Sequence, residues 1–157
     1  MIDDTDRKIC DILQQNARTS STDVATMVGL SVSATNERIR RLSDSGTITG
    51  WHATLRPDRF GAALCAFVLI DMSYEGEAEA VAALSQRAEV QELHHISGPH
   101  SYLMKLRVAD TAALQAFLTE AVKPLPAITR TETVITLGSP KETPAIAIPA
   151  GIGGADV

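Results

Sequence analysis

The spacing of apolar residues in the N-terminal part of the chain predicts three helices. Residues 3–16 have apolar positions at helical intervals, and their leading aspartates suit the positive end of a helix. A short helix is expected from Ser20, which with Asp23 resembles a capping box, to Gly29, a residue suited to helix ends. A third helix is expected from about 31 to 45. The stripe of the first helix consists of Ile2, Ile9, Ile12 and Leu13.

A short helix, a turn with glycine and a further helix follow one another in the order of a helix-turn-helix motif. In the third helix Thr35, Ile39 and Leu42 share the side expected to face the core. Small residues at its start can approach base edges, and arginines further along can bind phosphates or guanine edges. The expected DNA contacts are Ser33, Ala34, Asn36, Arg38, Arg40 and Arg41.

A solvated charged face is the simpler interpretation of these same positions. Glu37 lies among them, and its carboxylate can either accept a hydrogen bond from cytosine or pair with Arg40 or Arg41. The preceding short helix and its glycine turn favour the DNA-binding interpretation over the solvated face.

Residues 47–56 are rich in β-formers and interrupted at Gly50, which suits a strand or a small wing beside the helices. Trp51, the single tryptophan, is expected to pack against the protein more readily than to stack on a nucleotide. Pro57 and Asp58 then indicate a boundary, and 57–62 a linker.

After the linker the hydrophobic pattern predicts strands and helices in the order βαββαβ, the ferredoxin-like arrangement. In the third of these strands Lys105 and Arg107 are expected on the face opposite Met104 and Leu106. Two helices on one face of a four-stranded sheet leave its other face open, so a partner subunit is expected to cover it. The strands are expected at 64–73, 90–97, 102–108 and 128–137, and the helices at 77–88 and 111–122.

The 157 residues suit one domain or two small ones, and the net charge of -5 at first argues against nucleic acid. Residues 1–60 hold eight basic and eight acidic residues, whereas residues 61–157 hold six and eleven, so the deficit lies entirely in the second half. A concentrated basic face can therefore still serve DNA. No apolar run is long enough for a membrane span, the acidic start is unlike a secretory signal, and two cysteines make no disulfide framework, which indicates the cytoplasm.

The sequence shows no convincing catalytic or metal site, and no cofactor is expected. His94 and His95 point to opposite faces of a strand, and His100 suits ligand contact or a pH response better than metal binding. Ser97 and Ser101 lack a placed acid that would make a nucleophile pattern with His100. The methionines at 27, 72 and 104 are expected in the core.

Spaced motifs over residues 2–142 resemble the Lrp/AsnC, or feast/famine, family of transcription regulators. They run in order from the N-terminal helices to the last strand. These motifs are Asp3…Asp6-Arg7-Lys8-Ile9…Leu13-Gln14…Ala17-Arg18, Val28-Gly29-Leu30-Ser31…Arg38-Ile39-Arg40-Arg41-Leu42…Gly46-Thr47-Ile48, Ser97-Gly98…Tyr102-Leu103-Met104-Lys105-Leu106-Arg107-Val108 and Leu125-Pro126…Thr131-Glu132-Thr133.

The resemblance implies an N-terminal DNA-binding domain, a C-terminal ligand-sensing domain, dimers often assembled into octamers, and amino acids or related metabolites as effectors. It places the effector between dimers, near a loop that carries acidic residues in the family but lacks them here. Ser101 stands where an acidic residue is expected to hold the effector's ammonium group, so a charge-assisted bond is lost. An altered amino acid site, a different ligand and no ligand all remain open. The implied effector residues are Gly98, Pro99, His100, Ser101, Tyr102 and Thr133.

The sequence thus predicts an α+β protein that is an oligomeric, sequence-specific DNA-binding transcription regulator and not an enzyme. Two other hypotheses are a small ferredoxin-like enzyme with an appended helical domain and a weakly specific DNA-organising protein. The predicted partners are double-stranded promoter DNA, further copies of the chain and a small effector. The predicted division is a helix-turn-helix domain at 1–56, a linker at 57–62, a ferredoxin-like domain at 63–142 and a flexible tail at 143–157.

Overall fold

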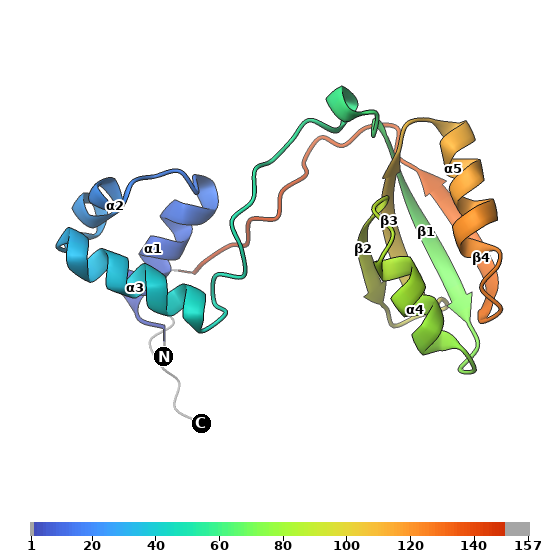
Figure 1. Cartoon of the computed structure of the whole chain (residues 1–157), viewed down its shortest axis with the longest axis horizontal. Coiled ribbons are helices and arrows are strands. Elements are labelled where there is room, and N and C mark those ends of the chain that lie inside the picture. The colour runs from blue at the N-terminus through green and yellow to red at the C-terminus, as the bar shows by residue number, and fades with distance from the viewer. Residues whose placement is uncertain (1, 150–157) are drawn as a thin grey trace. The chain divides into compact units, whose positions relative to one another are not determined.

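The structure, a computed structural model, describes residues 2–149 and shows two compact units (Figure 1). One unit contains residues 2–54 together with 142–149, and the other contains 55–141. Among the described helices none is long and apolar enough to cross a membrane.

Three helices build the first unit, as the apolar spacing predicts. Asp3, Ser20 and Ser31 are their N-caps, and each side chain accepts a hydrogen bond from a backbone N–H in the first turn. Asp3 and Asp6 form a reciprocal capping box, whereas the box expected at Ser20 lacks its return bond to the backbone. Gly29 ends the second helix in a left-handed conformation. The helices are α1 (Asp4–Gln15), α2 (Ser21–Val28) and α3 (Val32–Asp44), around a core of Ile9, Leu13, Val24 and Leu42.

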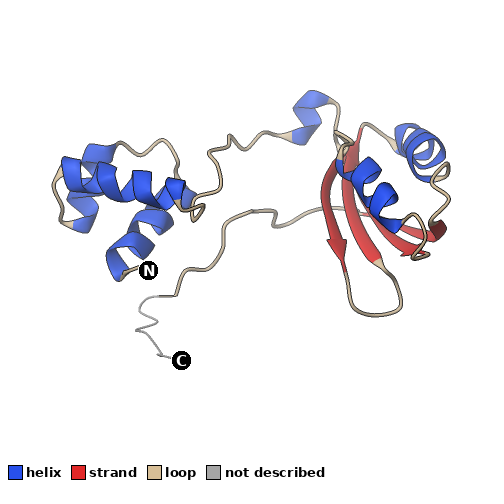
Figure 2. Cartoon of the chain, turned by 60° about the horizontal axis from the view of Figure 1, so that its bottom comes forward, coloured by secondary structure: helices blue, strands red, loops and turns tan. Residues whose placement is uncertain are grey.

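The strand or wing expected at 47–56 is absent. These residues form no helix or strand, and Figure 2 draws them as loop up to the short helix η1 (Pro57–Phe60), which occupies the expected linker. A strand needs a neighbour for its backbone hydrogen bonds, and no such ladder forms here within the described chain. Trp51 is 48% exposed, so the expected packing role is not met within one chain.

The second unit has the predicted βαββαβ order. Its four strands form an antiparallel sheet in the order β2-β3-β1-β4, and α4 and α5 cover one face (Figure 1). The last helix ends in one wider turn, Leu118–Val122, before the predicted stop at Pro124. The elements are β1 (Leu64–Met72), α4 (Glu77–Ser85), β2 (Val90–His95), β3 (Tyr102–Val108), α5 (Thr111–Phe117) and β4 (Ile128–Ile135).

The core of this unit lies between the sheet and the two helices. Burial alternates along β3 as predicted, with Met104 and Leu106 inaccessible and Lys105 on the other face. The placement of all three methionines in the core is partly wrong, because Met27 on α2 is 64% exposed. Four apolar residues of the strands remain at least partly accessible to water on the uncovered sheet face. These are Phe67, Leu69, Leu103 and Val134.

The segment after the second unit returns to the helical unit. Gln14 on α1 donates through Nε2 to the carbonyl of Ile146 at 2.9 Å, and its Oε1 accepts the Ile146 N–H at 3.1 Å. This part of the expected tail at 143–157 therefore contacts α1 in the structure, while residues 150–157 lie outside the described range. A side-chain amide that satisfies both groups of one peptide fixes the chain locally.

Replacing Gln14 with alanine is expected to release this segment from α1. Both hydrogen bonds are exposed, so the cost in stability should be small, about 0.5–1.5 kcal/mol. Hydrogen exchange of the amides in 142–149 should quicken. Gln15, which bonds only to Asp11 among the described residues, provides the control variant Gln15→Ala. Equal exchange in both variants would contradict the contact.

Candidate nucleic-acid interface and effector loop

The start of α3 presents small polar side chains to the surface. Ser33 and Asn36 are exposed and Ala34 is half-buried, while Thr35 between them is buried and its hydroxyl donates to the Ser31 carbonyl at 3.0 Å. The buried threonine fixes the rotation of the helix about its own axis. The side with Ser33 and Asn36 is therefore the one that α3 can offer to a groove of DNA.

Arg38 and Arg41, both predicted to contact DNA, converge on a carboxylate for which the sequence predicted no role. Asp6 is 1% exposed and accepts from Arg38 Nη1 at 2.8 Å and from Arg41 Nη2 at 2.9 Å. Its remaining capacity is used by the backbone N–H of Asp3 at 3.3 Å. Charge-assisted bonds of this kind connect α3 to the start of α1. Part of the predicted basic face therefore stabilises the helical unit.

Asp3 extends this network to the surface. Its carboxylate accepts from Arg38 Nη1 at 2.6 Å, and this bond holds the pKa of Asp3 below its ordinary value. Because the pKa of Asp3 is lower in the folded protein than in the unfolded chain, this bond stabilises the fold at every pH above the unfolded-state pKa, neutral pH included. The stabilisation is lost as the pH falls through the folded-state pKa.

Arg40 is the most exposed of the three arginines, with 66% of its side chain accessible. It lies 2.7 Å from Glu37 and 3.6 Å from Asp44, and its hydrogen bond lowers the pKa of Glu37. Surface pairs of this type are weak and exchange readily with other anions. Arg40 can therefore leave Glu37 for a phosphate.

The predicted effector loop lies between β2 and β3. Gly98 has φ +130°, a conformation that favours glycine, and Pro99 is exposed. Ser101 is bound to the end of β1, because its N–H donates to the Ile70 carbonyl at 3.0 Å and its hydroxyl accepts from the Met72 N–H at 3.2 Å. Ser101 thus holds the shape of the loop, and it supplies no negative charge to a ligand.

Two carboxylates missed in the sequence analysis lie beside this loop. Asp71 Oδ1 is 2.9 Å from Nδ1 of His100, and Glu77 accepts from the hydroxyl of Tyr102 at 2.7 Å. The bond to Glu77 and burial raise the pKa of Tyr102. The ring of His95 stacks on that of Tyr102, with 4.9 Å between ring centroids. The loop is therefore surrounded by groups that can hold a polar ligand.

Thr133, the last predicted effector residue, is not brought to the loop within one chain. Thr133 on β4 pairs with Val68 on β1. Tyr102 at the loop pairs instead with Ile70 on β1, and the partner of Ile70 on β4 is Thr131. Among residues 2–149, no group of three histidine, cysteine or acidic side chains is placed to hold a metal ion.

Two family models match the chain, one for each unit. The model described as the Lrp/AsnC ligand binding domain matches residues 65–146, which is more than half of the chain, and a winged helix-turn-helix DNA-binding model matches residues 2–49. The chain belongs to the Lrp/AsnC family. This Lrp/AsnC protein is a DNA-binding transcription regulator, with its DNA-binding domain first and its ligand-binding domain second.

Named relatives resemble the chain over nearly its whole length. The leucine-responsive regulatory protein of Salmonella typhimurium is 35% identical, covering 90% of this chain and 88% of the relative. The proline dehydrogenase transcriptional activator of Rhizobium radiobacter is 34% identical, covering 90% and 93%. A solved feast or famine regulatory protein from M. tuberculosis, complexed with L-methionine, is 32% identical with a TM-score of 0.88, covering 95% and 100%.

Of the three carboxylates for which no role was predicted, only Asp6 is marked by a pattern in the sequence, whereas Asp71 and Glu77 are not. Asp6 precedes Ile9 and Leu13 by three and seven positions, so it belongs to the apolar stripe of α1. A charged residue in such a stripe indicates a buried ion pair, and this pattern could have revealed Asp6. Asp71 and Glu77 lie beside the loop only through strand pairing and the turn before α4, so no local pattern in the Lrp/AsnC sequence marks them.

Proposed function

We propose that this regulator acts in the cytoplasm as a homodimer, and as an octamer built from four such dimers, on double-stranded promoter DNA. One α3 from each subunit would enter successive major grooves, with Ser33, Ala34 and Asn36 at the bases and Arg40 at a phosphate. The observation that carries this assignment is the exposed polar start of α3 beside a buried Thr35. Arg38 and Arg41 mainly hold α3 against α1 through Asp6, and Arg41 retains an exposed edge for DNA.

Recovery of genomic fragments bound by the purified protein tests this function. A regulator should enrich a limited set of promoter fragments that share a roughly symmetric motif. A weakly specific DNA-organising protein would recover fragments without preference, and an enzyme without a DNA role would recover none. Repeating the recovery with amino acids present measures the response to effectors.

Replacing Arg40 with alanine is expected to weaken binding to the recovered promoter fragment by roughly tenfold or more. Arg40 is exposed and its partners are on its own helix, so the fold should not change. The affinity can be measured by fluorescence anisotropy at a fixed salt concentration. Arg59, a surface arginine outside the helical unit, gives the control Arg59→Ala. Unchanged affinity in Arg40→Ala would remove Arg40 from the interface.

The open face of the sheet supports the dimer. Phe67, Leu69 and Leu103 are only half-buried, and Val134 on the same face is exposed, although no partner is present. A second copy that covers this face would remove apolar surface from water. In a twofold symmetric contact of one sheet on another, the same face of both subunits is buried.

The effector is proposed to be an amino acid or a related metabolite, as the L-methionine complex of the M. tuberculosis relative suggests. Because Ser101 brings no charge, the ammonium group would be held by Asp71, the carboxylate already in contact with His100 of the loop. Two further possibilities, a different ligand and no ligand at this loop, give distinct results in calorimetry of the intact protein with amino acids and related metabolites.

A further inference from the structure

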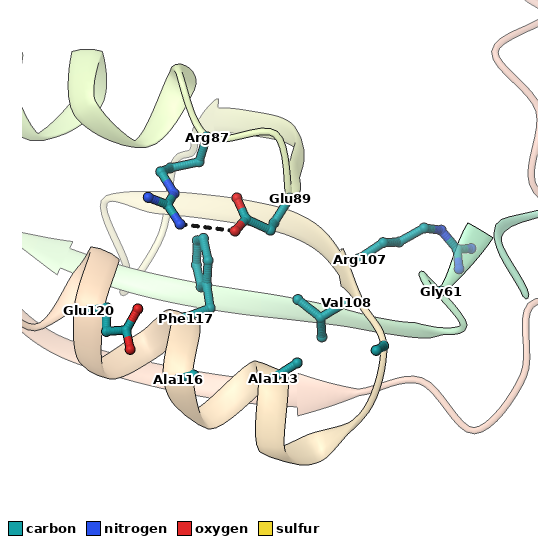
Figure 3. Close-up of a pocket in the computed structure, with 10 residues that line it drawn as sticks. Gly61, Arg87, Glu89, Arg107, Val108, Ala113, Ala116, Phe117 and Glu120 are labelled. Carbon is teal, nitrogen blue, oxygen red and sulfur yellow. Dashed lines mark hydrogen bonds and ion pairs between the residues drawn. The ribbon is translucent and has the colours of Figure 1, made fainter.

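The ligand-binding domain has a second hollow, at the end of the sheet opposite the effector loop (Figure 3). Its volume is about 360 Å³, and it is bordered by α5, the end of β3 and the turn between α4 and β2. Val108 pairs with Leu64 at this end of the sheet, whereas the loop adjoins the pair of Ile70 and Tyr102 at the other. The two locations are therefore separated by the length of β3.

The floor of the hollow is apolar and small. Val108 and the ring of Phe117 are buried, and Ala113 and Ala116 project only methyl groups from α5. Small side chains here leave space that larger ones would fill. A volume of this size lies at the lower end of the range of small-molecule sites, about 300–1,000 Å³, and suits a small metabolite.

Arg87 supplies a positive charge that is already held in place. Its guanidinium lies 5.7 Å from the centroid of the Phe117 ring, and its Nη2 donates to Glu89 at 2.9 Å. Within residues 2–149 this is the one hydrogen bond of the Arg87 side chain, so its other N–H groups can bind a carboxylate. A guanidinium already placed by a cation–π contact and one ion pair loses less conformational entropy when a ligand binds than a free one would.

Glu120 supplies a negative charge from a different element. It lies in the turn that follows α5, and in the view of Figure 3 the ring of Phe117 lies between it and Arg87. In the described part of the chain Glu120 has no ion pair, in contrast to Glu89. The guanidinium of Arg87 and the carboxylate of Glu120 lie at an apolar floor. They therefore suit a molecule that carries one negative charge, one positive charge and a short apolar part.

We propose that this hollow binds a free α-amino acid with a small apolar side chain, its carboxylate on Arg87 and its ammonium group on Glu120. This second site is independent of the effector loop. Gly61 lies on its rim, between η1 and the first strand, where the chain from the helical unit enters the sheet. A ligand in the hollow contacts this entry point and so couples amino acid concentration to the linker.

Titration calorimetry of the full-length protein with L-alanine, L-valine and L-methionine tests the proposal. At least one of them should bind, and Arg87→Gln and Glu120→Gln should each weaken that binding by about tenfold or more. Glu79→Gln, a change on the exposed first turn of α4, is the control. The methyl signals of Ala113 and Ala116 should shift when the amino acid is added.

The variant Asp71→Asn distinguishes amino acid binding in the hollow from binding at the effector loop. Binding that persists in Asp71→Asn and is lost in Arg87→Gln supports the second site. Binding that is lost in Asp71→Asn and unchanged in Arg87→Gln overturns the second site and leaves the proposed function intact. The absence of any amino acid binding to the wild-type protein also overturns it.

Discussion

Replacing Asp6 with alanine is expected to unfold the helical unit under conditions where the sheet domain remains folded. The buried carboxylate accepts bonds from Arg38, Arg41 and the N–H of Asp3, and the variant loses all of them. Breaking a buried ion pair by removing one partner costs roughly 3–5 kcal/mol. Both arginines are partly exposed and can turn to water, so the loss should lie near the lower value. The small core of this unit offers little to offset it.

Urea unfolding followed by far-ultraviolet circular dichroism measures this effect, because the described secondary structure of the first unit is helical and its loss lowers the helical signal. Asp4 provides the control, since it is exposed and, among residues 2–149, its one ion pair is to Arg7 at 4.0 Å. Asp4→Ala should change stability by less than about 0.5 kcal/mol. If Asp6→Ala and Asp4→Ala both unfold at the same urea concentration as the wild type, the network around Asp6 does not stabilise the unit.

Replacing Phe67 with aspartate is expected to convert the proposed dimer to a monomer and to lower the affinity for promoter DNA by about 100-fold. The change places a charge in the middle of the apolar sheet face, where a twofold contact would bring two such charges together. A monomer also loses the second α3, and with it the gain that linking two binding modules provides, about 10²–10⁴-fold. The domain should stay folded, because residue 67 lies on the sheet face away from the core and is only half-buried, so the new carboxylate stays in contact with water in the monomer.

Analytical ultracentrifugation gives the oligomeric state, and anisotropy gives the affinity for DNA. Gln115→Asp adds the same charge on the exposed surface of α5, away from the open sheet face, and should leave both unchanged. A Phe67→Asp protein that remains dimeric would show that another surface joins the subunits. A monomer with full DNA affinity would show that dimerisation does not contribute to binding.

Much of the fold could be predicted because its elements are set by local patterns. β3 is bounded as expected, since alternation from Tyr102 to Val108 places one face toward the helices. The wing at 47–56 could not be predicted correctly, because β-forming residues show a preference for strand but not the existence of a partner strand. Met27 was misplaced for a related reason, since an apolar residue on a short helix can remain at the surface.

The candidate site was less predictable than the fold because it depends on distant partners. Helical periodicity correctly placed Ser33 and Asn36 at the surface, but it could not distinguish Arg40 from Arg38, because Asp6 is 32 residues away from Arg38. The sequence shows that Ser101 stands where the family carries an acidic residue. The hydrogen bonds of Ser101 to β1, and the position of Asp71 beside the loop, follow from strand pairing alone.

The contact between Gln14 and Ile146 sets an order of events during synthesis. The two residues are 132 positions apart, and at roughly 5–20 residues per second Ile146 emerges about 7–26 s after Gln14. The residues of the three helices leave the ribosome first, but the DNA-binding unit receives this contact only after the sensing domain has been made. A chain that stops early would thus carry a DNA-binding unit that differs from the mature one.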